Sequence, residues 1–228
     1  MSLITMRGVG KTFPGAGGTF SALTDIDLDI AEREFVAVVG PSGSGKSTLL
    51  NLLAGIDRPA RGEIHVAGAR LDAMDERALA AWRGLGVGIV FQFFQLLPTL
   101  TAIENVMLPM DFCRRWAARA RAPRALALLD RLGVADQADK FPAAMSGGQL
   151  QRVAVARAMA NAPRLLLADE PTGNLDTRNA QALLDILAGL VADEGITVVM
   201  VTHERGALQR ASRAITLLDG RVQEPAHA

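Results

Sequence analysis

The segment that decides the fold is Val38-Val39-Gly40-Pro41-Ser42-Gly43-Ser44-Gly45-Lys46-Ser47-Thr48-Leu49-Leu50, a complete phosphate-binding loop. It fits G-x-x-x-x-G-K-[ST] and lies between an apolar β-type run and an amphipathic run, which is the context that the pattern requires. Glycines let the backbone turn tightly and aim successive N–H groups at a phosphate chain. The helix expected to begin near Lys46 adds the positive end of its dipole. The segment therefore predicts a nucleoside triphosphate site.

Each position of this loop has an expected task. Lys46 is expected to reach the β- and γ-phosphates, and the Ser47 hydroxyl to ligate Mg²⁺. The alternative is a glycine-rich turn with an incidental lysine, but the four fixed positions coincide by chance in only about one per cent of chains of this length. The predicted nucleotide-binding residues are Gly40, Pro41, Ser42, Gly43, Ser44, Gly45, Lys46, Ser47 and Thr48.

Composition restricts the class of protein. The 228 residues can form one domain with a substantial core, and 24 basic side chains balance 24 acidic ones, which argues against a nucleic-acid partner. No apolar run approaches the roughly 18 residues that span a bilayer, and residues 1–8 lack the apolar centre of a secretory signal. The single cysteine, Cys113, excludes an internal disulfide. We therefore expect a soluble, cytoplasmic protein.

Hydrophobic patterning predicts an α/β fold. Continuous apolar runs at 35–39, 165–168 and 197–201 indicate buried strands of a parallel sheet. Strict alternation of polar and apolar residues at 24–30 indicates a half-exposed antiparallel strand. The end of the chain, 214–222, is typical of a hairpin with Asp219-Gly220 at its turn.

A helical block interrupts these strands. Between about Gln92 and Ala160 the pattern is helical, with a capping box at Thr101-Ala102-Ile103-Glu104 and a further helix over 123–132. The sequence thus predicts a single domain, 1–228. It consists of a phosphate-loop α/β core with an antiparallel β edge and an inserted α-helical subdomain at about 93–160.

Two adjacent carboxylates follow the buried strand at 165–168. Open α/β sheets bind their ligands at the carboxyl ends of the strands, which is where Asp169 and Glu170 stand. Asp169 is suited to hold Mg²⁺, through water, and Glu170 to orient or deprotonate the attacking water. Alone, such an acidic pair fits a solvated turn equally well. Beside a phosphate loop it favours phosphoryl chemistry.

A second anion site is predicted in the helical block. Ser146, Gly147, Gly148 and Gln149 precede a helical run at 150–160, so a hydroxyl and two glycines stand at a helix N-terminus. In isolation an ordinary helix cap explains them. Two anion sites about 100 residues apart can serve one nucleotide only if the fold brings them together or if two copies of the chain face each other.

Taken together, the motifs resemble the nucleotide-binding subunit of an ABC transporter. The phosphate loop, Gln92, Ser146-Gly147-Gly148-Gln149, Asp169-Glu170, Asn174-Leu175-Asp176 and His203 occur in the order of that family. The resemblance implies ATP and Mg²⁺ as ligands and a dimer of two such chains packed head to tail. Each ATP then lies between the phosphate loop of one copy and the Ser146–Gln149 signature of the other.

The resemblance also assigns roles to single residues. It implies that Gln92 reaches Mg²⁺ and the attacking water, that Asp176 communicates across the dimer, and that His203 contacts the γ-phosphate. Phe13 occupies the place of an aromatic residue that stacks on adenine. A core phenylalanine is the competing interpretation of Phe13.

Two longer stretches, 91–106 and 167–176, resemble the branch that serves lipoprotein release and macrolide export. The resemblance implies an integral-membrane permease of few transmembrane helices with a large extracytoplasmic domain, docked on the helical block. It thereby implies a peripheral position at the cytoplasmic face of the inner membrane. The resemblance also implies that the partner, and not this chain, selects the cargo.

Alternatives remain open within this family. A cell-division regulator of the same branch carries the same residues. A non-transport ATPase of DNA repair or translation usually adds a coiled coil, a zinc insertion or a second cassette, none of which is present in the sequence. The arginines at 114–124 fit a solvated helix face, or a contact with permease loops or anionic headgroups worth roughly 1 kcal/mol per residue.

Overall fold

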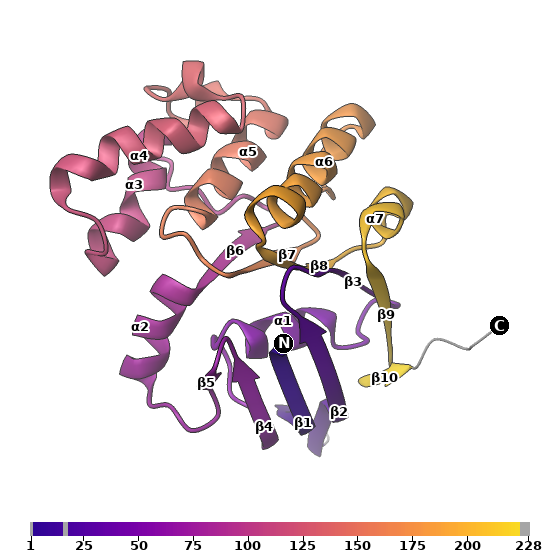
Figure 1. The fold of residues 1–228 in the computed structure, drawn as a ribbon. Coiled ribbons are helices and arrows are strands. Elements are labelled where there is room, and N and C mark those ends of the chain that lie inside the picture. The colour runs from indigo at the N-terminus through magenta and orange to yellow at the C-terminus, as the bar shows by residue number, and fades with distance from the viewer. Residues whose placement is uncertain (1, 16–17, 224–228) are drawn as a thin grey trace.

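A computed structural model describes residues 2–15 and 18–223 of the chain, and the structural statements below concern these residues. They form two sheets with helices between and around them (Figure 1). An antiparallel sheet has the order β2-β1-β4-β5. Its strands are β1 Ser2–Gly15, β2 Gly18–Ala31, β4 Arg61–Val66 and β5 Ala69–Arg70.

The central sheet has six strands in the order β10-β9-β3-β8-β7-β6. All neighbouring pairs are parallel except the terminal β9–β10 hairpin. Asp219 and Gly220 both have positive φ, 48° and 72°, as the predicted two-residue turn requires. The strands are β3 Phe35–Val39, β6 Val87–Phe91, β7 Leu165–Asp169, β8 Thr197–Val201, β9 Arg213–Leu218 and β10 Arg221–Gln223.

Helices cover both faces of the central sheet. In Figure 1, α1 lies between the two sheets, whereas α3, α4 and α5 form a separate block beside α6. None of the described helices is both long and apolar enough to cross a membrane. The helices are α1 Lys46–Leu53, α2 Glu76–Gly86, α3 Ala102–Cys113, α4 Ala118–Arg131, α5 Gly147–Ala158, α6 Thr177–Glu194 and α7 Arg205–Arg210, with 3-10 turns at Ala135–Gln137 and Pro142–Ala144.

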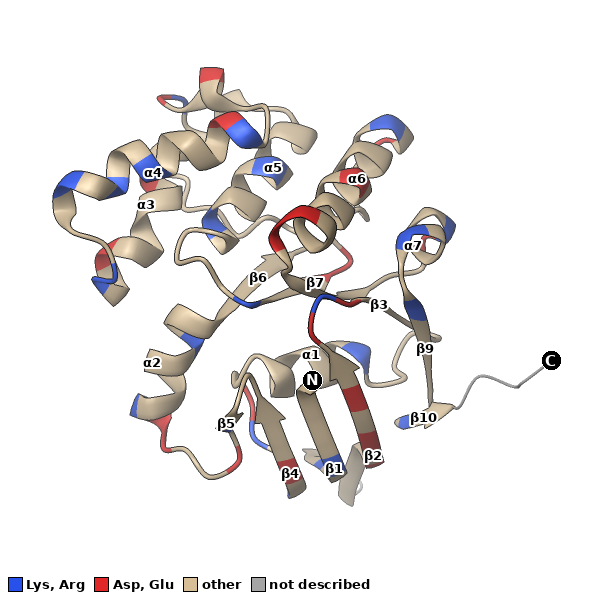
Figure 2. Ribbon diagram, in the orientation of Figure 1, with Lys and Arg blue, Asp and Glu red and all other residues tan. Residues whose placement is uncertain are grey.

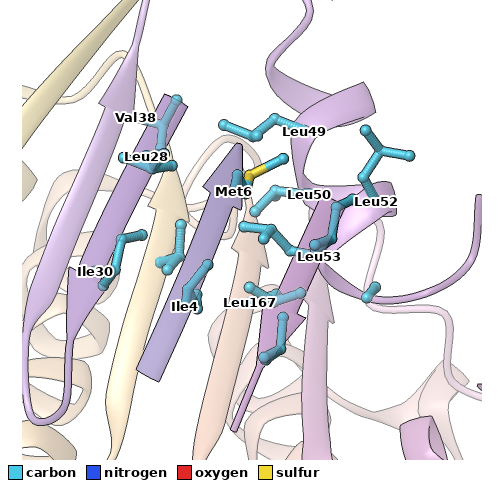
Figure 3. Close-up of a cluster of buried hydrophobic side chains, with 14 of the residues drawn as sticks. Ile4, Met6, Leu28, Ile30, Val38, Leu49, Leu50, Leu52, Leu53 and Leu167 are labelled. Carbon is cyan, nitrogen blue, oxygen red and sulfur yellow. The ribbon is translucent and has the colours of Figure 1, made fainter. Parts of the chain in front are cut away.

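Alternation along the central strands divides the apolar interior in two. Leu165 and Leu167 of β7 belong to the cluster that includes α1 and the antiparallel sheet, and Figure 3 shows Leu167 there. Leu166 and Ala168 face the helices of the other side. A strand that is buried on both faces needs apolar residues at every position, which is why the sequence shows continuous runs. The sheet is thereby fixed from both sides, and its carboxyl edge is a rigid platform.

The helical block agrees in outline with the prediction and differs in detail. Thr101 and Glu104 form the capping box at the start of α3, as expected. The next helix, α4, begins at Ala118 rather than at Pro123. Alanine and arginine are strong helix formers, and an internal proline removes only one hydrogen bond of the first turns, so the helix extends through it.

The arginines at 114–124 are largely engaged within the protein. Figure 2 shows basic segments along α4. Arg115 and Arg124 donate to the carbonyls of Asn161 and Ala160, and both guanidinium groups lie over the Trp116 ring. Arg121 pairs with Asp111. Two of the five side chains therefore join α4 and the segment before it to the end of α5, and a third, Arg121, pairs with α3.

Candidate nucleotide site

The phosphate loop connects β3 to α1, and close backbone contacts explain its glycines. Gly40 has φ 153°, and a Cβ there would lie 2.0 Å from the Leu217 carbonyl oxygen. Gly45 has φ 101°, and its Cβ would lie 2.5 Å from the carbonyl oxygen of Ala22. A larger residue at either position would displace backbone, so the loop is held tightly against β2 and β9.

The loop leaves the N-terminus of α1 open to an anion. The N-cap residue is Gly45, which has no side chain to satisfy the free N–H groups of the first turn. Lys46 is buried, and its Nζ donates to the carbonyl oxygens of Gly40 and Pro41 at 2.9 and 2.8 Å. Free N–H groups, the helix dipole and one ammonium group therefore converge at one point.

A cavity of about 310 Å³ opens at this point. It brings together residues from the loop, the β1–β2 hairpin and the ends of β7 and β8. Among the residues predicted to bind or act on nucleotide, its lining includes Phe13, Ser42, Gly43, Gly45, Lys46, Ser47, Thr48, Glu170 and His203. Gln92, Asp176 and residues 146–149 are not among the described residues that line it.

Glu170 and His203 meet at the edge of this cavity. Nε2 of His203 lies 3.3 Å from Oε1 of Glu170. Glu170 has φ 44°, an unfavourable left-handed conformation for a glutamate, and its N–H donates to the carbonyl oxygen of Val201. The strained backbone turns the carboxylate from the end of β7 toward the cavity, and strain of this kind is typical of functional sites.

Asp169 lies deeper than Glu170, at the end of β7. Burial raises the pKa of its carboxyl, and an interaction with the Ser47 hydroxyl partly opposes that shift. The carboxylate of Glu170 also raises this pKa, whereas the Lys46 ammonium lowers it. Asp169 and Ser47 thus offer two neighbouring oxygen donors, the ligand type that Mg²⁺ prefers.

Gln92 follows β6 and lies outside the cavity. Its Nε2 would be 2.8 Å from a Cβ on Gly173, so its side chain packs against the loop that follows Glu170. Asn174 donates its side-chain Nδ2 to the Gln92 carbonyl oxygen at 2.9 Å. Only a small residue at 173 leaves room for this arrangement.

The signature residues form the N-terminus of α5. Ser146 and Gln149 make a reciprocal capping box, so the Gln149 side chain is engaged within its own helix. A Cβ on Gly148 would lie 2.6 Å from Oδ1 of Asn179, and Asn179 is held by Asp176, the N-cap of α6. The predicted signature residues therefore form a capped helix N-terminus that packs on the Asp176 turn.

Two aromatic residues border the cavity: Phe13, which the resemblance indicated, and Phe20, which no motif indicated. Phe13 is 37% exposed and borders the cavity, so it is not a core residue. Phe20 is its cross-strand partner in the β1–β2 hairpin and borders the same cavity. The Lys11 ammonium lies 4.8 Å from the centre of the Phe13 ring. The sequence feature that could have indicated Phe20 is its position opposite the aromatic Phe13 on the paired strand.

Comparison with known proteins identifies the family. A family model described as ABC transporter matches residues 23–173. An uncharacterized ABC transporter ATP-binding protein of Methanocaldococcus jannaschii is 46% identical and covers 97% of this chain and 98% of its own length. The lipoprotein-releasing system ATP-binding protein LolD of Anaeromyxobacter dehalogenans is 45% identical, and the match covers 96% of this chain and 92% of LolD. The chain belongs to the ABC transporter family.

A solved structure supports the same assignment. The dimeric structure of MJ0796, described as a bacterial ABC transporter cassette, has a TM-score of 0.90 at 41% identity and covers 97% of both chains. A further structure of that cassette, at 40% identity, is described as a post-hydrolysis state bound to ADP and Pi. Membership of the ABC transporter family confirms the predicted fold and the predicted function, an ATP-binding and ATP-hydrolysing subunit.

Proposed function

We propose that this chain is one half of an ATP-driven dimer that powers a separate membrane permease. The proposal rests on one observation: within one chain, the predicted nucleotide-binding residues lie in two separate places. The cavity of one chain holds the phosphate loop with Glu170 and His203, whereas Ser146 at the start of α5 lies outside it. A second copy, packed head to tail, supplies the missing helix end.

Within the cavity, Glu170 acts as the general base and His203 holds it in place. The two side chains are within 3.3 Å of each other and face the phosphate loop. ATP places its γ-phosphate at the free N–H groups of α1, with Lys46 neutralising the β- and γ-phosphates. Glu170 accepts a proton from the attacking water, and His203 contacts the γ-phosphate.

We infer that the nucleotide binds together with Mg²⁺. Ser47 and Asp169 provide oxygen donors, and Gln92 is the third candidate, although its side chain lies against Gly173 in this structure. When bound, the ion would neutralise charge that develops on the phosphates. Closure of the dimer must bring Gln92 to the site if it is to take this role.

The signature of the second copy is proposed to complete the site. Ser146, Gly147 and Gly148 are placed at the N-terminus of a helix that has no acidic residue in its first turn, and such a helix end favours an anion. The Gln149 carboxamide maintains the cap. Asp176, packed below Gly148 through Asn179, is proposed to transmit closure between the two copies.

We further propose that 1–228 forms one nucleotide-binding domain whose helical subdomain, about 93–160, docks on the permease. The macrolide export ATP-binding/permease protein MacB 1/2 of Paracoccus denitrificans is 48% identical, and the chain matches 33% of its length. In that protein both functions share one chain. The relatives LolD and MacB favour transport or lipoprotein release over cell-division regulation and over non-transport ATPases.

The test of this function is reconstitution with the permease partner. We expect slow hydrolysis by the purified chain, faster hydrolysis with the permease, and association with the inner membrane, on its cytoplasmic face, only when the permease is expressed. Cell fractionation with and without the permease gene measures the last point. Membrane association that persists without the permease contradicts the proposal.

Asp169→Asn is expected to abolish Mg²⁺-dependent hydrolysis without lowering thermal stability. Because burial raises the pKa of Asp169 above its value in the unfolded chain, its contribution to stability is present below the unfolded pKa and is lost as the pH rises through the folded pKa. At pH 7 the ionised carboxylate therefore opposes folding, and asparagine removes that charge. Thermal unfolding without Mg²⁺ and turnover with Mg²⁺ measure the two effects. A marked fall in Tm would contradict this account.

Phe13→Ala and Phe20→Ala are each expected to raise the Kd for ATP by about ten-fold, since stacking of a base on an aromatic ring is worth about 1–3 kcal/mol. Inorganic tripolyphosphate, which lacks the base, serves as the matched ligand. Its affinity should not change. If Phe20→Ala leaves the Kd for ATP at the wild-type value, Phe20 has no part in binding the base.

A further inference from the structure

Arg157 of the signature helix α5 reaches the loop that carries Gln92. Its Nη2 donates to the Phe94 carbonyl oxygen at 2.8 Å and its Nη1 to the Gln95 carbonyl oxygen at 2.5 Å. The planar guanidinium therefore binds two consecutive carbonyl groups with two parallel donors. These contacts join segments that are more than 60 residues apart in the sequence.

The loop that Arg157 holds is strained. Phe94 and Gln95 have φ 59° and 53°, two consecutive residues in the left-handed region without a glycine. Such a conformation persists only where the surroundings enforce it. Arg157 donates to both strained residues, so it is placed to enforce the conformation of the segment that begins two residues after Gln92.

Arg157 has no described acidic partner. Burial lowers the pKa of its guanidinium, and no ion pair involving it occurs among the described residues. Arg157 is half-buried, so its charge loses part of its hydration, and hydrogen bonds to carbonyl groups offset part of that loss. The main interactions of the Arg157 side chain are therefore its hydrogen bonds to the carbonyl oxygens of Phe94 and Gln95.

The same helix also contacts the segment that precedes Gln92. Nε2 of Gln151 lies 3.4 Å from the Phe91 carbonyl oxygen, and Gln151 is fully buried. At the signature end of the helix, the tip of the Phe94 ring lies 3.9 Å from where a Cβ of Gly147 would be. Helix α5 thus contacts the chain on both sides of Gln92, so a shift of the helix would move the loop that carries Gln92.

We propose that Arg157 is a positioning residue for Gln92. It ties the loop 93–95 to α5, so that docking of the signature of one copy on ATP moves Gln92 of the same copy relative to that copy's own site. The two sites of the dimer are thereby coupled through a single rigid helix. This inference rests on the proposed function, because it assumes that Gln92 takes part in hydrolysis.

Arg157→Lys tests the proposal, because lysine keeps the charge and the length but loses the planar fork. The matched control is Arg152→Lys on the same helix, where Nη1 donates only to the Leu132 carbonyl oxygen, away from the Gln92 loop. Arg157→Met serves as a second variant, and thermal unfolding verifies that each variant folds. We expect Arg157→Lys to lower kcat by about ten-fold or more at an unchanged Kd for ATP, and the control to retain wild-type turnover.

A double-mutant cycle separates positioning from a structural role. If Arg157 acts through Gln92, Arg157→Lys causes no further loss in a Gln92→Ala background. Independent, multiplicative losses would overturn the proposal, as would wild-type turnover of either Arg157→Lys or Gln92→Ala.

Hydrogen exchange provides a readout that does not depend on hydrolysis. In the nucleotide-free chain, amides of residues 92–97 should exchange faster in Arg157→Lys than in the wild type or in Arg152→Lys. Equal exchange in all three proteins would overturn the tether itself. A wild-type chain that fails to hydrolyse ATP with its permease would instead refute the proposed function, and the exchange comparison would still decide whether Arg157 holds the loop.

Discussion

Replacement of Glu170 by glutamine is expected to lower ATP turnover by a factor of about 10² or more while ATP affinity is retained. Glutamine keeps the size of the side chain and its contact with His203 but cannot accept a proton from water. Since binding is unaffected and hydrolysis is blocked, the variant should accumulate as an ATP-bound dimer. Single-turnover kinetics and size-exclusion chromatography in the presence of ATP measure both effects.

Glu204 provides the matched control for this experiment. It follows His203 directly and accepts a hydrogen bond from Gln181 at 3.0 Å, but it does not line the nucleotide cavity. Glu204→Gln should hydrolyse ATP at nearly the wild-type rate. Near-normal turnover of Glu170→Gln would exclude Glu170 as the catalytic carboxylate.

Much of the parallel core could be predicted because its signals are local. The strands at 35–39 and 197–201 have the predicted bounds, since continuous apolar runs flanked by glycine and charged residues leave little choice. The capping box at Thr101 marked the start of α3 for the same reason. Local rules succeed where short-range geometry and burial agree.

Other elements escaped prediction for physical reasons. The helix α2, Glu76–Gly86, was not predicted, because it is short and its last turn contains Gly84 and Gly86, which have low helix propensity. Pro14 and Gly15 are turn-type residues, yet β1 continues to Gly15 because Gly15 still pairs with Gly18 of β2. The arginines at 114–124 were expected on a solvated face or at a partner contact, whereas Trp116 and two backbone carbonyls engage Arg115 and Arg124.

The candidate site also has parts that the sequence predicted and parts that it did not. The phosphate loop was predicted from its spacing, and the carboxylates after β7 were predicted from their place at a strand end in a chain that carries such a loop; the structure places Glu170 beside the loop. The Phe13–Phe20 pair depends on the register of the β1–β2 hairpin, and the Arg157 contact joins segments that are more than 60 residues apart, which no local pattern encodes. The division of the nucleotide site between two copies came from the family resemblance and not from the residues themselves.

Lys46→Ala and Ser146→Arg are each expected to reduce hydrolysis to near background, for different reasons. Lys46→Ala removes the cation that faces the phosphates, so ATP affinity falls as well. Ser146→Arg places a large side chain at the open end of α5 and blocks closure of the dimer. The phosphate loop of that variant is intact, so nucleotide binding by the isolated chain should remain. Nucleotide titration and turnover distinguish the two defects, and loss of binding in Ser146→Arg would contradict the assignment.

Mixing these two variants tests the shared site most directly. A mixed dimer has one damaged site, with both lesions, and one intact site formed by the loop of the Ser146→Arg chain and the signature of the Lys46→Ala chain. Random pairing in a two-fold dimer should restore about one quarter of the wild-type sites. Turnover that rises well above that of either variant alone is the predicted result. Turnover of the mixture that stays at the mean of the two separate variants would contradict a head-to-tail dimer in which each ATP is held by both copies.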